Sequence, residues 1–166
     1  QTCALPISAR DSYMTLRDSV SFIGEGVGVS ILKVKSGENA KYYSENKPNI
    51  LSTGKPSLLK NVTIRGLTFD WNGANNLLDS GAARRNNASI MTIYGAENLT
   101  VENCEFKETP GNQCIFINNY NIVTDQGKNI TIRNNIFTDN GEGLSGNYNY
   151  DHTSVYRSEE HTSELQ

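Results

Sequence analysis

The sequence predicts an all-β fold of the parallel β-solenoid type, and three segments that align without gaps are the main evidence. They are NVTIRGLTF (Asn61–Phe69), NLTVENCEF (Asn98–Phe106) and NITIRNNIF (Asn129–Phe137). Each begins with Asn, has Thr at its third position and ends with Phe. A unit of a few tens of residues cannot bury its apolar face alone, so such units stack on one another.

The pattern within each unit predicts short strands separated by a bend. Apolar residues alternate with polar ones, which indicates strands with one buried face. The sixth position holds Gly66, Asn103 or Asn134, residue types that tolerate a left-handed backbone. A further strand is expected before each of the last two units, at Ser89–Tyr94 and Gln113–Asn118.

Stacking of these units predicts that like residues lie over like: Phe over Phe, Thr over Thr and Asn over Asn. Stacked Asn side chains are expected to hydrogen-bond to one another at the bend. Met91 and Ile93 are predicted to lie over Ile115 and Ile117, pointing inward. An antiparallel sandwich with similar strand spacing is the alternative, but a sandwich has no reason to repeat its turn residues.

Length and charge exclude several classes of protein. A chain of 166 residues accommodates one domain. A formal net charge of -3 argues against a nucleic-acid binder. No segment approaches the roughly 20 apolar residues of a membrane span, so membrane insertion is not expected.

Both termini are expected to be translated sequencing adapter rather than natural protein. One permitted back-translation of RSEEHTSELQ (Arg157–Gln166) has a reverse complement that translates as QTCALPI (Gln1–Ile7). Residues 8–156 are therefore expected to be a partial domain, truncated at both ends, with residues 1–7 and 157–166 set aside.

Two segments resemble a known superfamily. SVSFIGEGVGVSILKV (Ser19–Val34), with two strands around a Gly-rich turn, and NVTIRGLTFDWN (Asn61–Asn72) are similar to the pectate-lyase-like (pectin lyase fold) superfamily, in the branch related to polygalacturonases and phage tail spikes. The resemblance implies a right-handed parallel β-helix with three parallel sheets. It also implies a groove bounded by the loops that follow each third strand, where polysaccharide lies.

The catalytic candidates are acids in these loops. Asp70 starts the insertion 70–87, and Asp139 and Glu142 lie in the corresponding loop two repeats later. Glycoside hydrolysis uses two carboxyl groups, about 6.5–9.5 Å apart in inverting enzymes and about 5–5.5 Å apart in retaining ones. Asp at the end of a strand is more often a turn residue, which is the competing interpretation. His152 follows Asp151, but neighbours on a strand point to opposite faces.

The candidate substrate-binding residues come from two places. The outward face of the first strands is predicted to carry Ile90, Thr92 and Tyr94 beside Cys114, Phe116 and Asn118. Among these, Tyr94, Phe116 and Asn118 suit sugar stacking and hydroxyl binding, although strand surfaces often carry such residues. Trp71 lies at the groove edge, and Arg84 and Arg85 could bind a uronate carboxylate.

Two functions from different classes remain open. The first is a secreted glycoside hydrolase or polysaccharide lyase that binds and cleaves an acidic polysaccharide. The second is a non-catalytic glycan-binding tail spike, for which a homotrimer would be expected; a purely structural β-helix is a third alternative. No cofactor is predicted, except Ca²⁺ for a lyase. The resemblance implies an extracellular location or the surface of a virion.

Overall fold

The computed structural model describes residues 14–36, 51–52, 58–76, 89–109, 113–118, 127–140 and 153–158. Within these residues the fold is all-β, with three parallel sheets and one 3₁₀ turn, η1 (Gly73–Asn75). Sheet A contains β1 (Met14–Thr15), β4 (Leu51–Ser52), β7 (Ser89–Ile93), β10 (Gln113–Asn118) and β13 (Thr153–Ser158). Sheet B contains β2 (Phe22–Ile23), β5 (Leu59–Arg65), β8 (Ala96–Glu102) and β11 (Lys128–Arg133). Sheet C contains β3 (Ile31–Lys33), β6 (Thr68–Asp70), β9 (Glu105–Lys107) and β12 (Ile136–Thr138).

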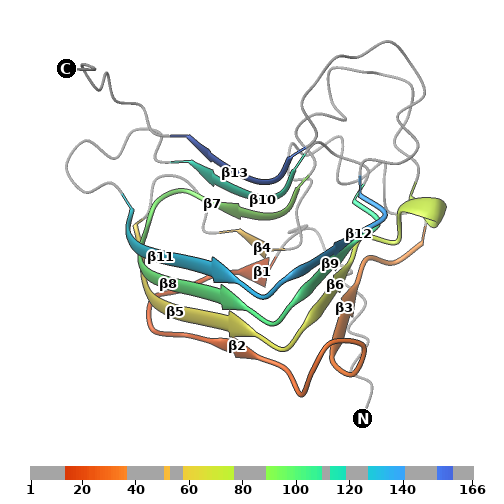
Figure 1. Ribbon diagram of the computed structural model, residues 1–166, viewed down its shortest axis with the longest axis horizontal. Coiled ribbons are helices and arrows are strands. Elements are labelled where there is room, and N and C mark those ends of the chain that lie inside the picture. Colours follow the sequence, from red (N-terminus) through yellow and green to blue (C-terminus); the bar gives the residue numbers. More distant parts are fainter. Residues whose placement is uncertain are drawn as a thin grey trace.

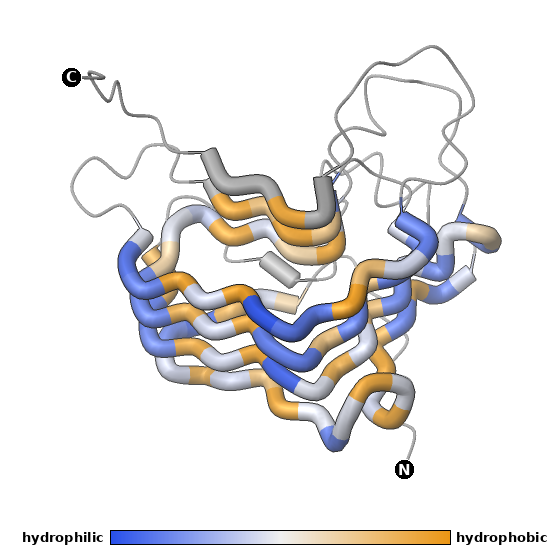
Figure 2. Tube along the Cα trace, viewed as in Figure 1, coloured by the Kyte–Doolittle hydropathy of each residue, from blue (hydrophilic) through white to orange (hydrophobic). Residues whose placement is uncertain are grey.

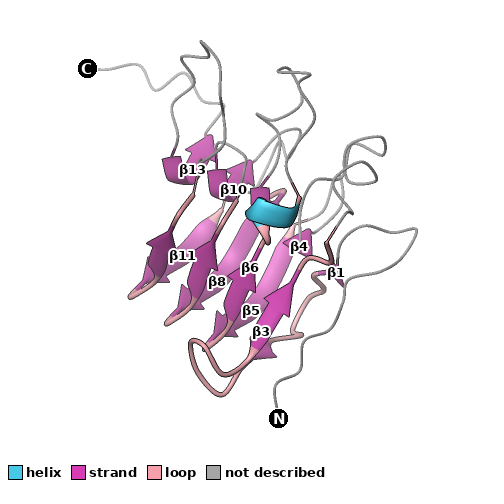
Figure 3. Cartoon of the chain, turned by 90° about the vertical axis from the view of Figure 1, so that its right-hand side faces the viewer, coloured by secondary structure: helices cyan, strands magenta, loops and turns pink. Residues whose placement is uncertain are grey.

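The chain visits the three sheets in turn and then begins again. We call each set of one strand from sheets A, B and C a repeat, so repeat 1 is β1–β3 and repeat 4 is β10–β12. Each strand pairs in parallel with its equivalent in the next repeat, as β5 does with β8. Sheets B and C meet at a bend and sheet A lies opposite them (Figure 1). Turned by 90°, the strands of successive repeats stand in rows (Figure 3).

Like residues stack on like residues, as the sequence predicts. Thr63, Thr100 and Thr131 are in register across sheet B. The rings of Phe69 and Phe106 stack with centroids 5.1 Å apart, and those of Phe106 and Phe137 with centroids 5.4 Å apart. Met91 and Ile93 lie over Ile115 and Ile117, which confirms the predicted register of sheet A.

The bend at the sixth position is confirmed, but the asparagine ladder lies elsewhere. Gly66, Asn103 and Asn134 have φ of 65°, 51° and 54°. The side-chain ladder forms instead at the first position of each unit. There, Asn98 Nδ2 donates to Asn61 Oδ1 at 2.8 Å, and Asn129 Nδ2 donates to Asn98 Oδ1 at 2.9 Å. These three residues are also left-handed, with φ of 53–56°, so each of these sheet B strands also bends near its start, at a residue inside the strand.

Repeat 1 contains a fourth copy of the unit seen in Asn61–Phe69. Its residues differ too much from the other three copies to be found by sequence identity. Ser19 is left-handed, with φ of 60°, and its amide donates to the Lys60 carbonyl at 2.9 Å. Ser19 therefore occupies the position of Asn61. At the bend of this copy, a Cβ on Gly24 would collide with the Gly66 carbonyl. The Gly-rich turn between the two strands therefore lies where two repeats approach closely.

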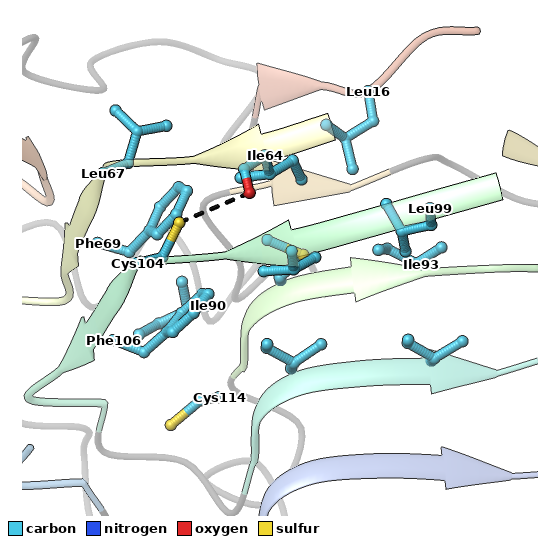
Figure 4. Packing of buried hydrophobic residues seen from close by; sticks show 14 of the residues in the cluster. Leu16, Ile64, Leu67, Phe69, Ile90, Ile93, Leu99, Cys104, Phe106 and Cys114 are labelled. Atoms are coloured by element: carbon cyan, nitrogen blue, oxygen red, sulfur yellow. Dashed lines mark hydrogen bonds between the residues drawn. The ribbon is translucent and has the colours of Figure 1, made fainter. Parts of the chain in front are cut away.

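The core lies between the three sheets and is contributed by all of them. Apolar positions recur in rows along the repeats (Figure 2). Ile64, Phe106 and Ile93, from sheets B, C and A, have no exposed surface. The expectation that Ile90 and Cys114 point outward is wrong. Both are buried, and Ile90 lies beside Phe106 (Figure 4). The paired register passes from Ser89–Gln113 to Met91–Ile115 without them, and we infer that a local bend turns both side chains inward.

The last strand extends past residue 156, where the sequence analysis ends the partial domain. β13 begins at Thr153 and continues to Ser158. Arg157 pairs with Ile117 and Ser158 with Asn118. Parallel pairing uses backbone groups, so it continues along the exposed edge of β10 whatever the side chains are.

Candidate functional site

The C-terminal ends of the sheet C strands carry a cluster of charged residues, which we call the sheet C exit (Lys33–Ser36, Asp70–Asn76, Lys107–Thr109 and Thr138–Asn140). Lys33, Asp70 and Lys107 occupy equivalent, in-register positions in three successive repeats. Lys33 Nζ lies 2.8 Å and Lys107 Nζ 3.7 Å from Asp70 Oδ2. The Asp70 side chain is 4% exposed, whereas the Lys33 and Lys107 side chains are 43% and 31% exposed. Two accessible cations therefore flank one buried anion.

Asp70 is also fixed by the backbone that follows it. Its Oδ1 accepts a hydrogen bond from the Asn72 amide at 2.7 Å, and Asn72 is buried and left-handed. Asn72 Nδ2 donates to the Val34 carbonyl at 3.0 Å, which links repeat 2 to repeat 1. With both oxygens engaged, the predicted catalytic residue Asp70 acts as an ion-pair and turn residue in this structure.

Trp71, a predicted substrate-binding residue, lies in the core. Its side chain has no exposed surface and belongs to the main apolar cluster. A ring without exposed surface has no face to offer a ligand. After Trp71 the chain turns through η1, where Asn75 Nδ2 donates to Asn72 Oδ1 at 2.8 Å.

Asp139, a predicted catalytic residue, is the equivalent in repeat 4 of Glu108 in repeat 3, a residue that the sequence analysis did not single out. The Glu108 amide donates to the Thr138 carbonyl at 3.1 Å, as the Trp71 amide does to the Lys107 carbonyl at 3.0 Å. Trp71, Glu108 and Asp139 are therefore equivalent residues of repeats 2, 3 and 4. Extending the aligned segments two residues beyond the shared Phe would have revealed this.

The backbone at these two acids is unusual. Glu108 has φ of 54° and Asp139 has φ of 51°. Asp adopts this conformation fairly readily, whereas Glu rarely does. Asp139 is exposed and Glu108 half-buried. Adjacent parallel strands lie about 4.8 Å apart, so the two residues occupy neighbouring levels at the same edge of sheet C.

The side chain of Asn140 hydrogen-bonds to the backbone around these two acids. Asn140 Nδ2 donates to the Phe106 carbonyl at 2.8 Å, while Asn140 Oδ1 accepts from the Thr109 amide at 3.0 Å. One side chain thus satisfies two backbone groups of the preceding repeat on either side of Glu108. This clamp fixes the backbone that carries both Glu108 and Asp139.

The predicted binding residues Tyr94, Phe116 and Asn118 lie at sheet A and not at the sheet C exit. Tyr94 directly follows β7 and Phe116 lies in β10; both are half-buried, and Asn118 ends β10. Arg84, Arg85, Glu142 and His152 lie outside the described residues. Within the part of the chain that the structure describes, no three His, Cys, Asp or Glu residues are grouped to hold a metal ion. No helix in that part is long and apolar enough to cross a membrane.

No protein family model, curated protein or solved structure matches the chain.

Proposed function

We propose that the three sheets form a right-handed parallel β-helix whose sheet C exit binds an acidic polysaccharide and cleaves it. The β-helix is supported by the order in which the chain visits sheets A, B and C and by the shared core. The polysaccharide is supported by the resemblance of Ser19–Val34 and Asn61–Asn72 described above. The observation that carries the site is the stacked pair Glu108 and Asp139 beside the accessible ammonium groups of Lys33 and Lys107.

The charges suggest how a uronate polymer would be held. Successive repeats present equivalent side chains at intervals of about 4.8 Å along the stack. A chain of sugars lying along the stack would meet Lys33 and Lys107 in turn, with their ammonium groups facing its carboxylates. Asp70 is saturated by hydrogen bonds and ion pairs, and its role is to hold the two lysines in place.

The carboxyl pair suggests the chemistry. In glycoside hydrolysis, one carboxyl protonates the leaving oxygen and the other acts as nucleophile or activates water. The spacing of adjacent strands, about 4.8 Å, is nearer to the separation of a retaining pair than to that of an inverting pair. In a lyase, one acid would remove a proton from the sugar and the other would protonate the leaving glycosidic oxygen as the C–O bond breaks, while a lysine neutralised the uronate carboxylate.

Incubation of the purified chain with uronate and neutral polysaccharides tests this proposal. We expect new reducing ends from a uronate polymer alone. Absorbance of an unsaturated uronate product would identify a lyase, and its absence a hydrolase. Binding without cleavage would favour the non-catalytic spike. The absence of both binding and cleavage would contradict the proposal.

A matched set of variants tests the lysines. Lys33→Gln and Lys107→Gln are expected to weaken binding of the uronate polymer, because each removes one of the accessible cations. Lys60→Gln, on sheet B and paired with Glu97 at 3.7 Å, is the control. Binding should weaken as salt rises, because exposed charges are screened.

A further inference from the structure

We propose that the sheet C exit recognises a polysaccharide in which uronate units alternate with uncharged sugars. This inference rests on the proposed function and narrows its class of substrate. Its basis is one position of the sheet C strands, at which four side chains are in register across the repeats. From repeat 1 to repeat 4 these are a cation, a buried anion, a cation and an uncharged residue: Lys33, Asp70, Lys107 and Thr138.

The spacing of the repeats allows one sugar to lie beside each of them. Equivalent residues of successive repeats are about 4.8 Å apart. A pyranose unit advances an extended polysaccharide by a similar distance. A polymer lying along the stack therefore meets a lysine at repeats 1 and 3 and none at repeats 2 and 4 of this row.

Asp70 makes repeat 2 unfavourable for a carboxylate. Lys33 Nζ and Lys107 Nζ lie 2.8 Å and 3.7 Å from Asp70 Oδ2. A substrate carboxylate at this level would be repelled by Asp70 and would compete with it for both ammonium groups. An uncharged sugar avoids this cost. Carboxylates at repeats 1 and 3 can reach the lysines from solvent, because the two lysine side chains are 43% and 31% exposed.

Repeat 4 also favours an uncharged sugar. Thr138 is in register with Lys107 but supplies a hydroxyl group and no charge. The next residue, Asp139, is an exposed acid. A carboxylate beside repeat 4 would therefore meet a like charge and no cation from residues 138–140, whereas a sugar hydroxyl could hydrogen-bond to either side chain.

The total charge of the exit points to the same substrate. Its described residues include three lysines and three acids: Lys33, Lys35, Lys107, Asp70, Glu108 and Asp139. A polymer with a carboxylate on every unit would find no net positive surface there. A polymer with a carboxylate on every second unit can pair its charges with two lysines and keep the others away from the acids.

Labelled oligosaccharides of equal length test this inference by fluorescence anisotropy with the full chain. Hyaluronan and unsulfated chondroitin oligosaccharides alternate glucuronate with two different uncharged sugars, and oligogalacturonate carries a carboxylate on every unit. We expect both alternating ligands to bind at least about threefold more tightly than oligogalacturonate, since single exposed charge contacts are weak. Equal or tighter binding of oligogalacturonate would overturn the inference and leave the uronate site standing. Binding of none of the three would contradict the proposed function as well.

A variant at repeat 4 tests the order of charges independently of the sugars. Thr138→Lys adds a cation where an alternating polymer has an uncharged unit, and Thr138→Gln is the uncharged control of similar length. With β-sheet circular dichroism intact in both variants, Thr138→Lys should strengthen oligogalacturonate binding more than hyaluronan binding. An equal gain for the two ligands would overturn the inference, because only net charge would then matter.

Discussion

The carboxylate of Asp70 accepts a hydrogen bond from Lys33 Nζ at 2.8 Å across an interval of 37 residues. The two residues are paired in register on neighbouring strands of sheet C. The contact exists only because repeat 2 stacks on repeat 1. This one contact stabilises the stacking of the two repeats and also positions Lys33, whose ammonium group we propose binds substrate.

Asp70→Asn should therefore destabilise the fold. The amide keeps the shape but loses the charge that Lys33 and Lys107 face, and the Asn72 amide loses a charged acceptor. Hydrogen bonds to charged groups contribute about 1.5–3 kcal/mol, and the exposure of both lysines reduces the ion-pair part. We expect a loss of about 1–3 kcal/mol in urea unfolding. Asp139→Asn, at an exposed position, should change stability by less than about 0.5 kcal/mol.

We expect glutamate at position 108 to lower the free energy of unfolding of the protein. Its φ of 54° is unfavourable for a long side chain, and Asn tolerates this conformation better. Glu108→Asn should raise the free energy of unfolding by about 0.5–1 kcal/mol. Thr131→Asn, in an exposed and extended strand position, should give no gain. A loss of stability in Glu108→Asn would show that Glu108 has a structural role.

The side-chain hydrogen bonds of the asparagine ladder and the left-handed backbone at the same residues contribute separately to stability, and two variants of Asn98 measure the two contributions. Asn98 donates to Asn61 and accepts from Asn129. Asn98→Gly keeps the left-handed conformation and removes both bonds, and we expect a loss of about 1 kcal/mol. Asn98→Ala removes the same bonds and also places an alanine, which tolerates the left-handed conformation less well than glycine or asparagine, at this position, for a further loss of about 1 kcal/mol. Equal stability of the two variants, measured by thermal and urea unfolding, would contradict this account.

The buried thiols predict how stability depends on pH. Burial raises the pKa of Cys114 to about 12, and burial also raises the pKa of Cys104. The folded state then keeps protons that the unfolded thiols release, so stability should fall as pH rises above the ordinary thiol pKa of about 8.5. The slope for one thiol is at most about 1.4 kcal/mol per pH unit. Cys114→Ala should flatten the decline between pH 9 and 11, and an unchanged slope would contradict burial of this thiol.

The repeat explains both what could be predicted from sequence and what could not. Identical residues that stack on one another, such as Phe69 and Phe106, reveal the register directly. Ser19 fills the position of Asn61 with another side chain, so comparison by identity missed repeat 1. Strict alternation failed at Ile90 and Cys114, because both point inward.

The site was harder to predict than the fold. Asp70 was chosen because it follows a strand, but contacts from other repeats determine that it is buried and paired. Such contacts have no signature in the local sequence. Glu108 and Asp139 lie two residues beyond the aligned segments, so their equivalence required a longer alignment. The left-handed backbone that both residues share is known only from the structure.

Cleavage of a uronate polysaccharide by matched acid variants tests the central claim most directly. Initial rates of reducing-end formation would be measured for the unmodified chain, Glu108→Gln, Asp139→Asn and the sheet B control Glu97→Gln. General acid–base catalysis contributes about 10²–10⁴-fold, so each of the first two variants should lose at least about 100-fold while the control keeps its rate. Unchanged rates in Glu108→Gln and Asp139→Asn would contradict a catalytic role for the sheet C exit.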